Sequence, residues 1–333
     1  MTIVDDSLAT AAELLRDRIG HHVRADVALA QLTTYRVGGA AALFVDARSI
    51  DDLMAVAQVR RATGVPVLVV GRGSNMLVAD SGFEGVALSI AGFADVIDLP
   101  EPPGTTGDAC CVTAGGGVSM PVVARRTAAA GITGFEWAVG VPGSIGGAVR
   151  MNAGGHGSDM AACLVDVDVF DLDAADAPVT IGVDELGLRF RASALAPSAV
   201  VVAARLRLAF GDRATSEREI AEVVRWRREH QPGGQNCGSV FVNPVPHEVS
   251  AGGLIDSLGL RGFRIGTAWV SDKHANFIQA SECGRAADVR AVMEAVRQRV
   301  AEQTGYQLRS EVRLVGFDDT DPMSFDDRLE AGG

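Results

Sequence analysis

Three side chains that lie far apart along this sequence could act together on a substrate that carries a carboxylate. Arg191 offers a guanidinium, Ser239 a hydroxyl and Glu311 a carboxyl group. A guanidinium binds a carboxylate in a planar fork, while hydroxyl and carboxyl groups can donate protons. We therefore expect an enzyme that holds a substrate carboxylate and delivers a proton to carbon.

Several glycine-dense turns lie upstream of Arg191. Gly71–Asn75 follows an apolar segment, and Gly140–Ala148 and Asn152–Gly155 come later in the chain. Glycine permits positive φ angles and lets successive backbone N–H groups point at one anion. Taken alone, each cluster could be an ordinary tight turn. Together they indicate a long ligand threaded between two lobes, and a dinucleotide such as FAD has that length.

Other ligand-binding and catalytic motifs are missing from the sequence. A P-loop needs a lysine after its last glycine, but Lys273, the only lysine, follows Asp272. The dinucleotide fingerprint of Rossmann folds fails because Met76 stands where its third glycine belongs. The sequence has neither the H-E-x-x-H zinc motif nor the G-x-S-x-G elbow of serine hydrolases. We therefore expect no metal site.

The composition is that of an acidic globular protein, with 47% hydrophobic residues, 22% charged residues and a net charge of −12. This charge argues against a nucleic-acid partner. No apolar run approaches the roughly 18 residues of a membrane span. The five cysteines contain no C-x-x-C pair, and an odd number does not suit a disulfide framework. We expect a cytoplasmic protein without a membrane partner, as a monomer or weak oligomer.

The elements that must position these residues fall into several regions of mixed helices and strands. The length of 333 residues exceeds what one small core requires. We predict a first lobe over residues 1–90, a second lobe over 91–214 and a third domain over 215–317. The last residues, 318–333, are rich in aspartate and have little to bury, which predicts an acidic mobile tail.

Periodicity and end signals predict individual elements within these regions. Ser49 and Gly64 bound a predicted helix, and Ser216 with Glu219 predicts a capping box that opens another. Further helices are expected over 5–20, about 119–130 and from Val289 to near Gly305. Strands are expected at 33–37, 41–45, 65–70, 163–171, 198–210 and 308–315.

Six segments, read in order, resemble those of a known family. They are Tyr35–Gly39, Gly71–Asn75, Gly140–Gly147, Phe190–Ser193, Cys237–Phe241 and Ser310–Arg313. The same segments occur in the same order in the UDP-N-acetylenolpyruvoylglucosamine reductase (MurB) family, which the chain resembles over about residues 20–317. The resemblance implies an α+β fold: a two-lobed FAD-binding module of the PCMH type, followed by a C-terminal α+β substrate domain.

The resemblance also implies a reaction and its cofactors. The family are cytoplasmic flavoenzymes that use NADPH as hydride donor and non-covalently bound FAD. They reduce the enolpyruvyl group of UDP-N-acetylglucosamine enolpyruvate to UDP-N-acetylmuramate for peptidoglycan synthesis. This chain departs from the family at Phe190, where a tyrosine is usual, and at Arg72, where glycine is frequent. Short segments after Ser193 and Pro244 resemble the shorter subtype, which lacks a loop that closes over the substrate.

Residue roles follow from the resemblance. It implies that Arg191 binds the substrate carboxylate, that a protonated Glu311 hydrogen-bonds it, and that Ser239 supplies the proton to carbon. Substrate-binding residues are expected at Asn243, Lys273, His274 and Arg227. Cofactor-binding residues are expected at Tyr35, Arg36, Gly71, Arg72, Gly73, Ser74, Asn75, Met76, Val141, Pro142, Gly143, Ser144, Gly146, Gly147, Asn152 and Gly154.

Other interpretations remain open. From the residue pattern alone, Arg191 could form a surface ion pair, Ser239 could end a turn, and Glu311 could lie on a solvated strand face. At the level of function, the chain could be an FAD-dependent oxidase of the same flavoprotein superfamily. It could also be a non-catalytic protein that binds flavin or a sugar nucleotide.

Overall fold

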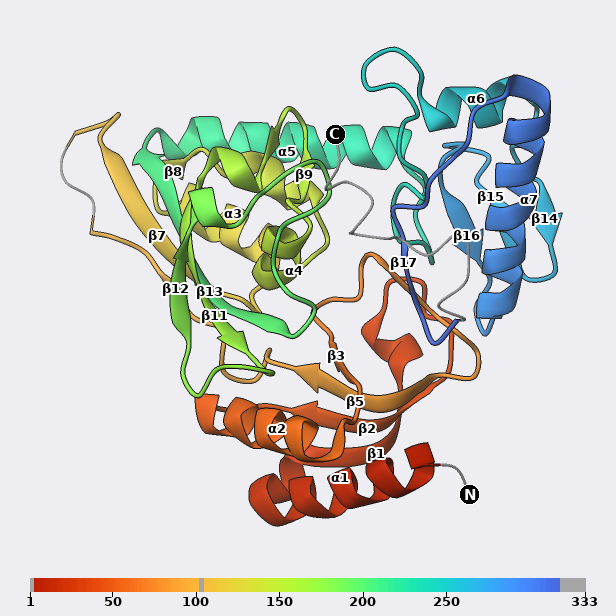
Figure 1. The fold of residues 1–333 in the computed structure, drawn as a ribbon. Helices are drawn as coiled ribbons and strands as arrows, with labels where there is room; N and C mark the ends of the chain where they lie inside the picture. The colour runs from red at the N-terminus through yellow and green to blue at the C-terminus, as the bar shows by residue number, and fades with distance from the viewer. Residues whose placement is uncertain (1–2, 102–104, 318–333) are drawn as a thin grey trace. The chain divides into compact units, whose positions relative to one another are not determined.

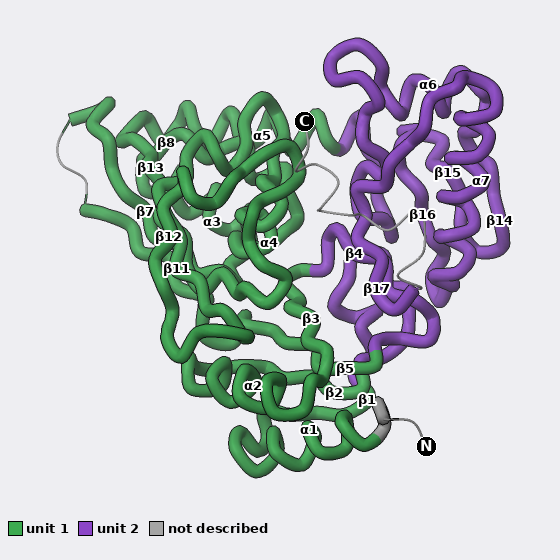
Figure 2. Tube along the Cα trace, viewed as in Figure 1, with its two compact units in different colours: residues 1–26, 42–72, 84–227 green, residues 27–41, 73–83, 228–333 purple. Residues whose placement is uncertain are grey.

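The computed structural model describes residues 3–101 and 105–317, and it divides the chain into two units built from separated segments (Figure 2). Unit 1 comprises residues 1–26, 42–72 and 84–227, and unit 2 comprises residues 27–41, 73–83 and 228–333. The predicted division at residues 90 and 214 stays a prediction. The predicted tail, 318–333, lies outside the described residues.

Unit 1 contains a four-stranded sheet with two helices on it (Figure 1). Its strands run in the order β1 (Val23–Ala28), β2 (Ala40–Asp46), β5 (Phe83–Ser89) and β3 (Val67–Val69). Helices α1 (Ile3–Ile19) and α2 (Ile50–Thr63) pack against each other and share a core with this sheet. The end signals predicted for α2 are confirmed. Ser49 Oγ accepts from the N–H of Asp52 at 3.2 Å, and Gly64 is left-handed with a φ of 72°.

A second, larger sheet of unit 1 is built around β13 (Ala199–Phe210), and it confirms two of the predicted strands. Its strand order is β12 (Val179–Gly182), β11 (Leu164–Asp171), β13, β7 (Ala109–Gly115) and β6 (Ile97–Asp98), with β8 (Ile132–Thr133) also paired to β13. The core beside this sheet includes residues of α3 (Met120–Ala129) and α4 (Ile145–Arg150). The hairpin of β9 (Gly154–Gly155) and β10 (Ser158–Asp159) follows α4.

Helix α5 (Arg213–His230) begins earlier than the predicted capping box at Ser216. Asp212 caps it instead, because Asp212 Oδ1 accepts from the N–H of Thr215 at 2.8 Å. Ser216 lies inside the helix, buried, and its hydroxyl donates to Glu136 Oε1 at 2.5 Å. The predicted capping box is therefore wrong, since a tertiary hydrogen bond uses the serine that the local pattern assigned to the cap.

Unit 2 carries a small antiparallel sheet, β14 (Arg264–Ile265), β15 (Ala268–Val270) and β16 (Ile278–Ala280), with α7 (Ala286–Thr304) packed on it (Figure 1). Helix α6 (Ala251–Ser257) lies next to α7. The predicted apolar stripe of α7 is confirmed: Val289, Val292, Val296 and Val300 are fully buried. The helix ends at the left-handed Gly305, as predicted.

The strand predicted over 308–315 is shorter in the structure. Only β17 (Arg313–Val315) is a regular strand, and it runs parallel to β4 (Met76–Val78). Ser310 Oγ accepts from the N–H of Val312 at 3.0 Å and donates to its carbonyl at 3.1 Å. The hydroxyl of Ser310 thus binds the N–H and the carbonyl of Val312, which in a continuing strand would pair with a neighbouring strand.

The strand predicted at 33–37 is absent, and the segment is irregular. Arg36 has a φ of 52° and Gly38 a φ of 102°, conformations that a strand does not contain. The segment is fixed instead by contacts with the 73–83 segment of unit 2. Thr34 N–H donates to Gly73 O at 3.3 Å, and Gly39 N–H donates to Ala79 O at 2.8 Å.

Candidate functional site

The glycine run Gly115–Gly117, at the end of β7, lies beside the predicted segment Gly140–Ala148 in unit 1. Gly146 N–H donates to Gly116 O at 2.8 Å, and Met120 N–H donates to Gly143 O at 2.9 Å. Within the second segment, Ser144 caps α4, and its Oγ accepts from the N–H of Gly147 at 3.4 Å. The structure therefore brings several predicted cofactor residues of this segment against the turn that follows β7.

Gly71 joins the same cluster. A Cβ at Gly71 would lie 2.3 Å from Ser144 Oγ, closer than any such contact can be, so only glycine fits without displacing Ser144. Three glycine-containing turns therefore meet around the hydroxyl of Ser144. The buried Nε1 of Trp137 and Oγ of Ser193, both in unit 1, have no hydrogen-bond partner among the described residues. Such unsatisfied donors fit a site that takes a polar ligand.

The other half of the first glycine turn belongs to unit 2. Gly73 has a φ of 55°, and a Cβ there would lie 2.2 Å from Leu32 O. This close approach packs the turn against the segment that contains the predicted residues Tyr35 and Arg36. Arg36, the left-handed residue of this segment, is also fixed by a side chain, because its N–H donates to Thr33 Oγ1 at 3.2 Å.

Tyr35 is fully buried in the core of unit 2, next to Cys237. Burial raises the pKa of Cys237 to about 12, and it raises the pKa of Tyr35 as well. Both groups are therefore protonated at neutral pH. Both side chains therefore have a packing role in this core.

Arg191 is held in unit 1 by the segment of predicted cofactor residues. It lies in a tight turn in which Arg189 and Ala192 exchange backbone hydrogen bonds, and its φ of 57° is left-handed. Its Nη1 donates to Gly154 O at 3.3 Å. Asn152 steadies the same turn, because its Nδ2 donates to Arg189 O at 3.2 Å. The structure thus brings together three of the predicted residues: Arg191, Asn152 and Gly154.

Arg227 lies near the end of α5, beside a small aromatic pair. The rings of Trp226 and His156 meet edge to face with centroids 5.1 Å apart. Burial lowers the pKa of His156, and the charge of Arg227 lowers it further. Burial also lowers the pKa of Arg227 itself. His156 is therefore a neutral imidazole at physiological pH, next to a half-buried cation that the resemblance assigns to the substrate.

Ser239 and Glu311 belong to neighbouring segments of unit 2. Glu311 N–H donates to Val240 O at 2.8 Å, and Phe241 pairs with Ser310 in an antiparallel bridge. The two predicted catalytic side chains therefore come from segments that are bonded to each other. Arg191 belongs to unit 1, so the convergence of all three side chains stays a prediction.

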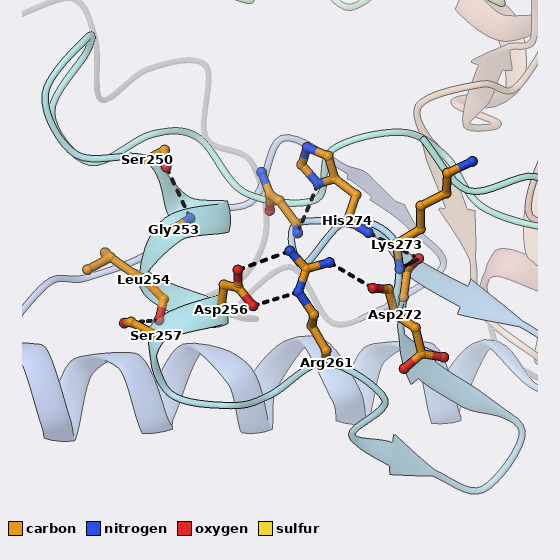
Figure 3. Close-up of polar contacts among 11 residues, drawn as sticks. Ser250, Gly253, Leu254, Asp256, Ser257, Arg261, Asp272, Lys273 and His274 are labelled. Atoms are coloured by element: carbon orange, nitrogen blue, oxygen red, sulfur yellow. Dashed lines mark hydrogen bonds and ion pairs between the residues drawn. The ribbon is translucent and has the colours of Figure 1, made fainter. Parts of the chain in front are cut away.

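The predicted substrate residues Lys273 and His274 lie on one loop of unit 2 (Figure 3). Ser271 Oγ accepts from the N–H groups of Lys273 at 3.1 Å and His274 at 3.4 Å. Lys273 Nζ donates to the carbonyl of Arg228. Burial, followed by the charge of Arg261, lowers the pKa of His274, which is therefore neutral at pH 7. Its Nδ1 accepts from the N–H of Asn276 at 3.2 Å, so the neutral ring carries its proton on Nε2 and can donate it to a sugar hydroxyl.

Asn243, the remaining predicted substrate residue, uses its side chain within unit 2. Its Oδ1 accepts from the N–H of Ala251 at 3.1 Å, at the start of α6, where Ser250 Oγ also accepts from Gly253 N–H at 3.0 Å. The oxygen of Asn243 therefore orients α6, and its amide N–H groups are the donors that a substrate would use.

Two residues that sequence reasoning missed organise this region. Arg261 lies between two partners in Figure 3, donating to both carboxylate oxygens of Asp256 at 2.5 and 3.0 Å and to Asp272 O at 2.7 Å. Asn276 exchanges two hydrogen bonds with the backbone of Phe241, at 3.0 and 2.8 Å. The loop with His274 is thus tied to the segment with Ser239. A lone asparagine between apolar neighbours was the only sequence signal for Asn276.

Within the described residues, no group of His, Cys, Asp or Glu side chains is arranged to hold a metal ion. Over residues 3–101 and 105–317, none of the helices has the length and apolarity that crossing a bilayer requires.

Two family models match the chain. Residues 41–175 match the FAD binding domain, and residues 230–315 match the C-terminal domain of UDP-N-acetylenolpyruvoylglucosamine reductase. The first match contains the glycine segments of unit 1 and the Gly71–Asn75 turn. The second contains Ser239, Lys273, His274 and Glu311.

Relatives match over most of their length. A UDP-N-acetylenolpyruvoylglucosamine reductase of Heliobacterium modesticaldum is 42% identical over 287 residues, which cover 85% of this chain and 88% of that protein. One from Synechococcus sp. strain WH7803 is 40% identical, with coverages of 89% and 94%. The crystal structure of the Thermus caldophilus reductase (MurB) superposes with a TM-score of 0.73 at 34% identity, covering 88% of this chain and 99% of that one. The predicted α+β flavoprotein fold is confirmed.

Proposed function

The chain belongs to the UDP-N-acetylenolpyruvoylglucosamine reductase family, and on this premise we propose that it reduces the enolpyruvyl group of UDP-N-acetylglucosamine enolpyruvate. The product is UDP-N-acetylmuramate, a peptidoglycan precursor, so the reaction serves cell wall biogenesis, cell shape and cell division. The observation that carries this proposal is the 42% identity to a reductase over 85% of the chain. The enzyme is an FAD-dependent oxidoreductase, and NADPH is the proposed hydride donor.

FAD, when bound, supplies the chemistry of accepting a hydride from NADPH and passing it to the substrate carbon. The residues proposed to hold it without a covalent bond are those of the glycine segments, together with Asn152 and Gly154. The fit is supported by the close packing of the glycine turns at Gly71, Gly116 and Gly146 and by the unsatisfied Nε1 of Trp137. Backbone N–H groups and a few hydroxyls suit the phosphates of a dinucleotide.

Arg191 is proposed to bind the substrate carboxylate. When hydride reaches the methylene carbon of the enolpyruvyl group, negative charge develops on the adjacent carbon and spreads into the carboxylate that this carbon bears. Donors aimed at the carboxylate oxygens stabilise that charge. A guanidinium suits the task because it binds carboxylate oxygens in a planar fork. The left-handed turn and the bond to Gly154 support a positioned side chain rather than a solvated one.

Glu311 is proposed to hydrogen-bond the same carboxylate in its protonated form, and Ser239 is proposed to deliver the proton that completes the reduction. The backbone bond between Glu311 and Val240 supports a shared location for the two groups. A neutral serine is a weak acid, so the carbon it protonates must be strongly basic at that stage.

The sugar nucleotide is proposed to contact Lys273, His274, Asn243 and Arg227. Lysine and arginine provide charge for the diphosphate, and the neutral His274 and the amide of Asn243 provide hydrogen bonds for the sugar. The fixed loop of Lys273 and His274 supports this assignment, since Ser271 holds both backbone N–H groups.

We further propose a cytoplasmic location and a monomeric or weakly associated state. The five cysteines are all free thiols, which is consistent with a reducing compartment. The net charge of −12 gives no support for a nucleic-acid partner.

The absorption spectrum of the purified protein tests the function. We expect a flavin spectrum that NADPH bleaches under anaerobic conditions and that the enolpyruvyl sugar nucleotide then restores. Rapid recovery in air, with no response to the sugar nucleotide, would instead identify an oxidase. A flavin spectrum that NADPH leaves unchanged would identify a non-catalytic binding protein.

A further inference from the structure

The backbone of Glu311 is held from two sides, and one of the partners comes from the first glycine turn. Its N–H donates to Val240 O at 2.8 Å. Its carbonyl accepts from Asn75 Nδ2, also at 2.8 Å. Two residues further on, Arg313 N–H donates to Asn75 O at 3.0 Å. All four residues belong to unit 2, so these contacts lie within one folded body.

The surroundings make this a rigid attachment. Ser310 and Val312, on either side of Glu311, are 4% and 0% exposed, while Glu311 itself is partly exposed. Asn75 directly precedes β4, which pairs with β17 in the parallel register Met76 to Arg313. A displacement of Asn75 therefore moves the backbone of Glu311, because a direct hydrogen bond and the adjoining β4–β17 pair join the two residues.

We propose that Asn75 is a positioning residue for Glu311, in addition to its predicted place beside the cofactor. The amide donor fixes the carbonyl of Glu311 and with it the direction in which the glutamate side chain leaves the backbone. A carboxyl group that must meet the substrate carboxylate tolerates little displacement, since a shift of about 1 Å can cost about 100-fold in rate. The inference rests on the proposed function, because the role of Glu311 does.

The two half-reactions of the holoenzyme separate this role from cofactor binding. With FAD supplied at saturating concentration, we expect Asn75→Ala to be slowed far more in reoxidation than in reduction by NADPH, whatever its loss of FAD affinity. Reoxidation of the reduced enzyme by the enolpyruvyl sugar nucleotide should slow by about 10- to 100-fold. Asn75→Asp, which keeps the shape but cannot donate to the carbonyl, should slow the same step. Stopped-flow absorbance measures both rates.

Two controls make the test specific. Ser250→Ala removes another backbone cap from unit 2, at the start of α6, and should leave the ratio of the two half-reaction rates unchanged while lowering the melting temperature. In a Glu311→Gln background, Asn75→Ala should slow reoxidation by less than about twofold more, because residues that act through one another are not additive.

Several outcomes would overturn the inference. Multiplicative losses in the Glu311→Gln background would show that Asn75 acts independently of Glu311. Equal slowing of both half-reactions in FAD-saturated Asn75→Ala would assign Asn75 to the cofactor alone. Unchanged reoxidation in Asn75→Ala and Asn75→Asp would reject the positioning role while the function stands. A wild-type enzyme that the sugar nucleotide cannot reoxidise would reject the function, and this inference with it.

Discussion

At the scale of single residues, Ser239 lies next to Val240, whose N–H donates to Asn276 O at 2.9 Å and whose carbonyl binds Glu311. Removal of the hydroxyl should leave this backbone in place. We therefore expect Ser239→Ala to be reduced by NADPH normally but to reduce the enolpyruvyl sugar nucleotide about 100- to 10,000-fold more slowly. Ser257→Ala, which removes a hydroxyl that donates to Leu254 O on α6 (Figure 3), is the matched control. Unchanged turnover of Ser239→Ala would refute the role of this serine.

The cysteines should differ sharply in reactivity. Cys111 and Cys283 are exposed, whereas Cys163 and Cys237 are buried and burial raises the pKa of each to about 12. A maleimide at pH 8 should label the exposed pair within minutes and the buried pair only after unfolding, as mass spectrometry of peptides would report. Rapid labelling of Cys237 in the folded protein would contradict its position in the core.

The same shift has a consequence for stability. The pKa of Cys163 and Cys237 is raised from an ordinary value of 9.0, so the folded state retains two protons that the unfolded state releases. The contribution is complete below about pH 9 and is lost as the pH rises toward 12. The free energy of unfolding should therefore fall over this range, and less steeply in Cys163→Ala. Urea denaturation at several pH values measures the difference.

Motif and chemistry agree at Arg191, Ser239 and Glu311, so the sequence singles these residues out, and their roles stay predictions. Arg261 and Asn276 were not singled out, because their importance lies in backbone carbonyls and N–H groups supplied by distant segments. Asp272 O and the backbone of Phe241 become partners only after folding. A single sequence carries no record of such contacts.

At the scale of elements, local end signals were reliable where the capping partner is also local. Ser49 caps α2 through the N–H of Asp52, three residues away. Ser216 had an equally good capping-box pattern with Glu219. In the structure, however, its hydroxyl donates to the buried carboxylate of Glu136 instead. The strand predicted at 33–37 failed for a related reason, since left-handed residues and contacts to 73–83 replaced a regular ladder.

The cap of α2 provides a test of stability at this scale. Ser49→Ala leaves the N–H of Asp52 without its side-chain acceptor and should lower the free energy of unfolding by about 0.5–2 kcal/mol. Ser81→Ala, at an exposed loop serine, should change it by less than about 0.5 kcal/mol. Equal effects of the two substitutions, measured by urea denaturation, would mean that the cap is not stabilising.

At the scale of the whole molecule, cofactor and fold should be linked. A ligand that binds only the folded protein stabilises it by about 2.7 kcal/mol at 100 times its Kd. The melting temperature of FAD-depleted protein should therefore rise as FAD is added back. Gly71→Ala should weaken this dependence, because the new methyl group displaces Ser144. Gly233→Ala, where a Cβ meets nothing within 4 Å, should not. A melting temperature that does not change when FAD is added would contradict the proposed FAD site.

The composition of unit 2 has a consequence for biosynthesis. Tyr35 and Leu77 belong to the same core as the valines of α7, although a long stretch of unit 1 separates them in the chain. On the ribosome these two side chains emerge well before α7 and β17, which belong to the same unit. A gene truncated to begin at residue 228 would likewise encode a strand β17 without its parallel neighbour. Unit 2 is thus completed by residues from both sides of unit 1, and its core cannot close until α7 and β17 have been made.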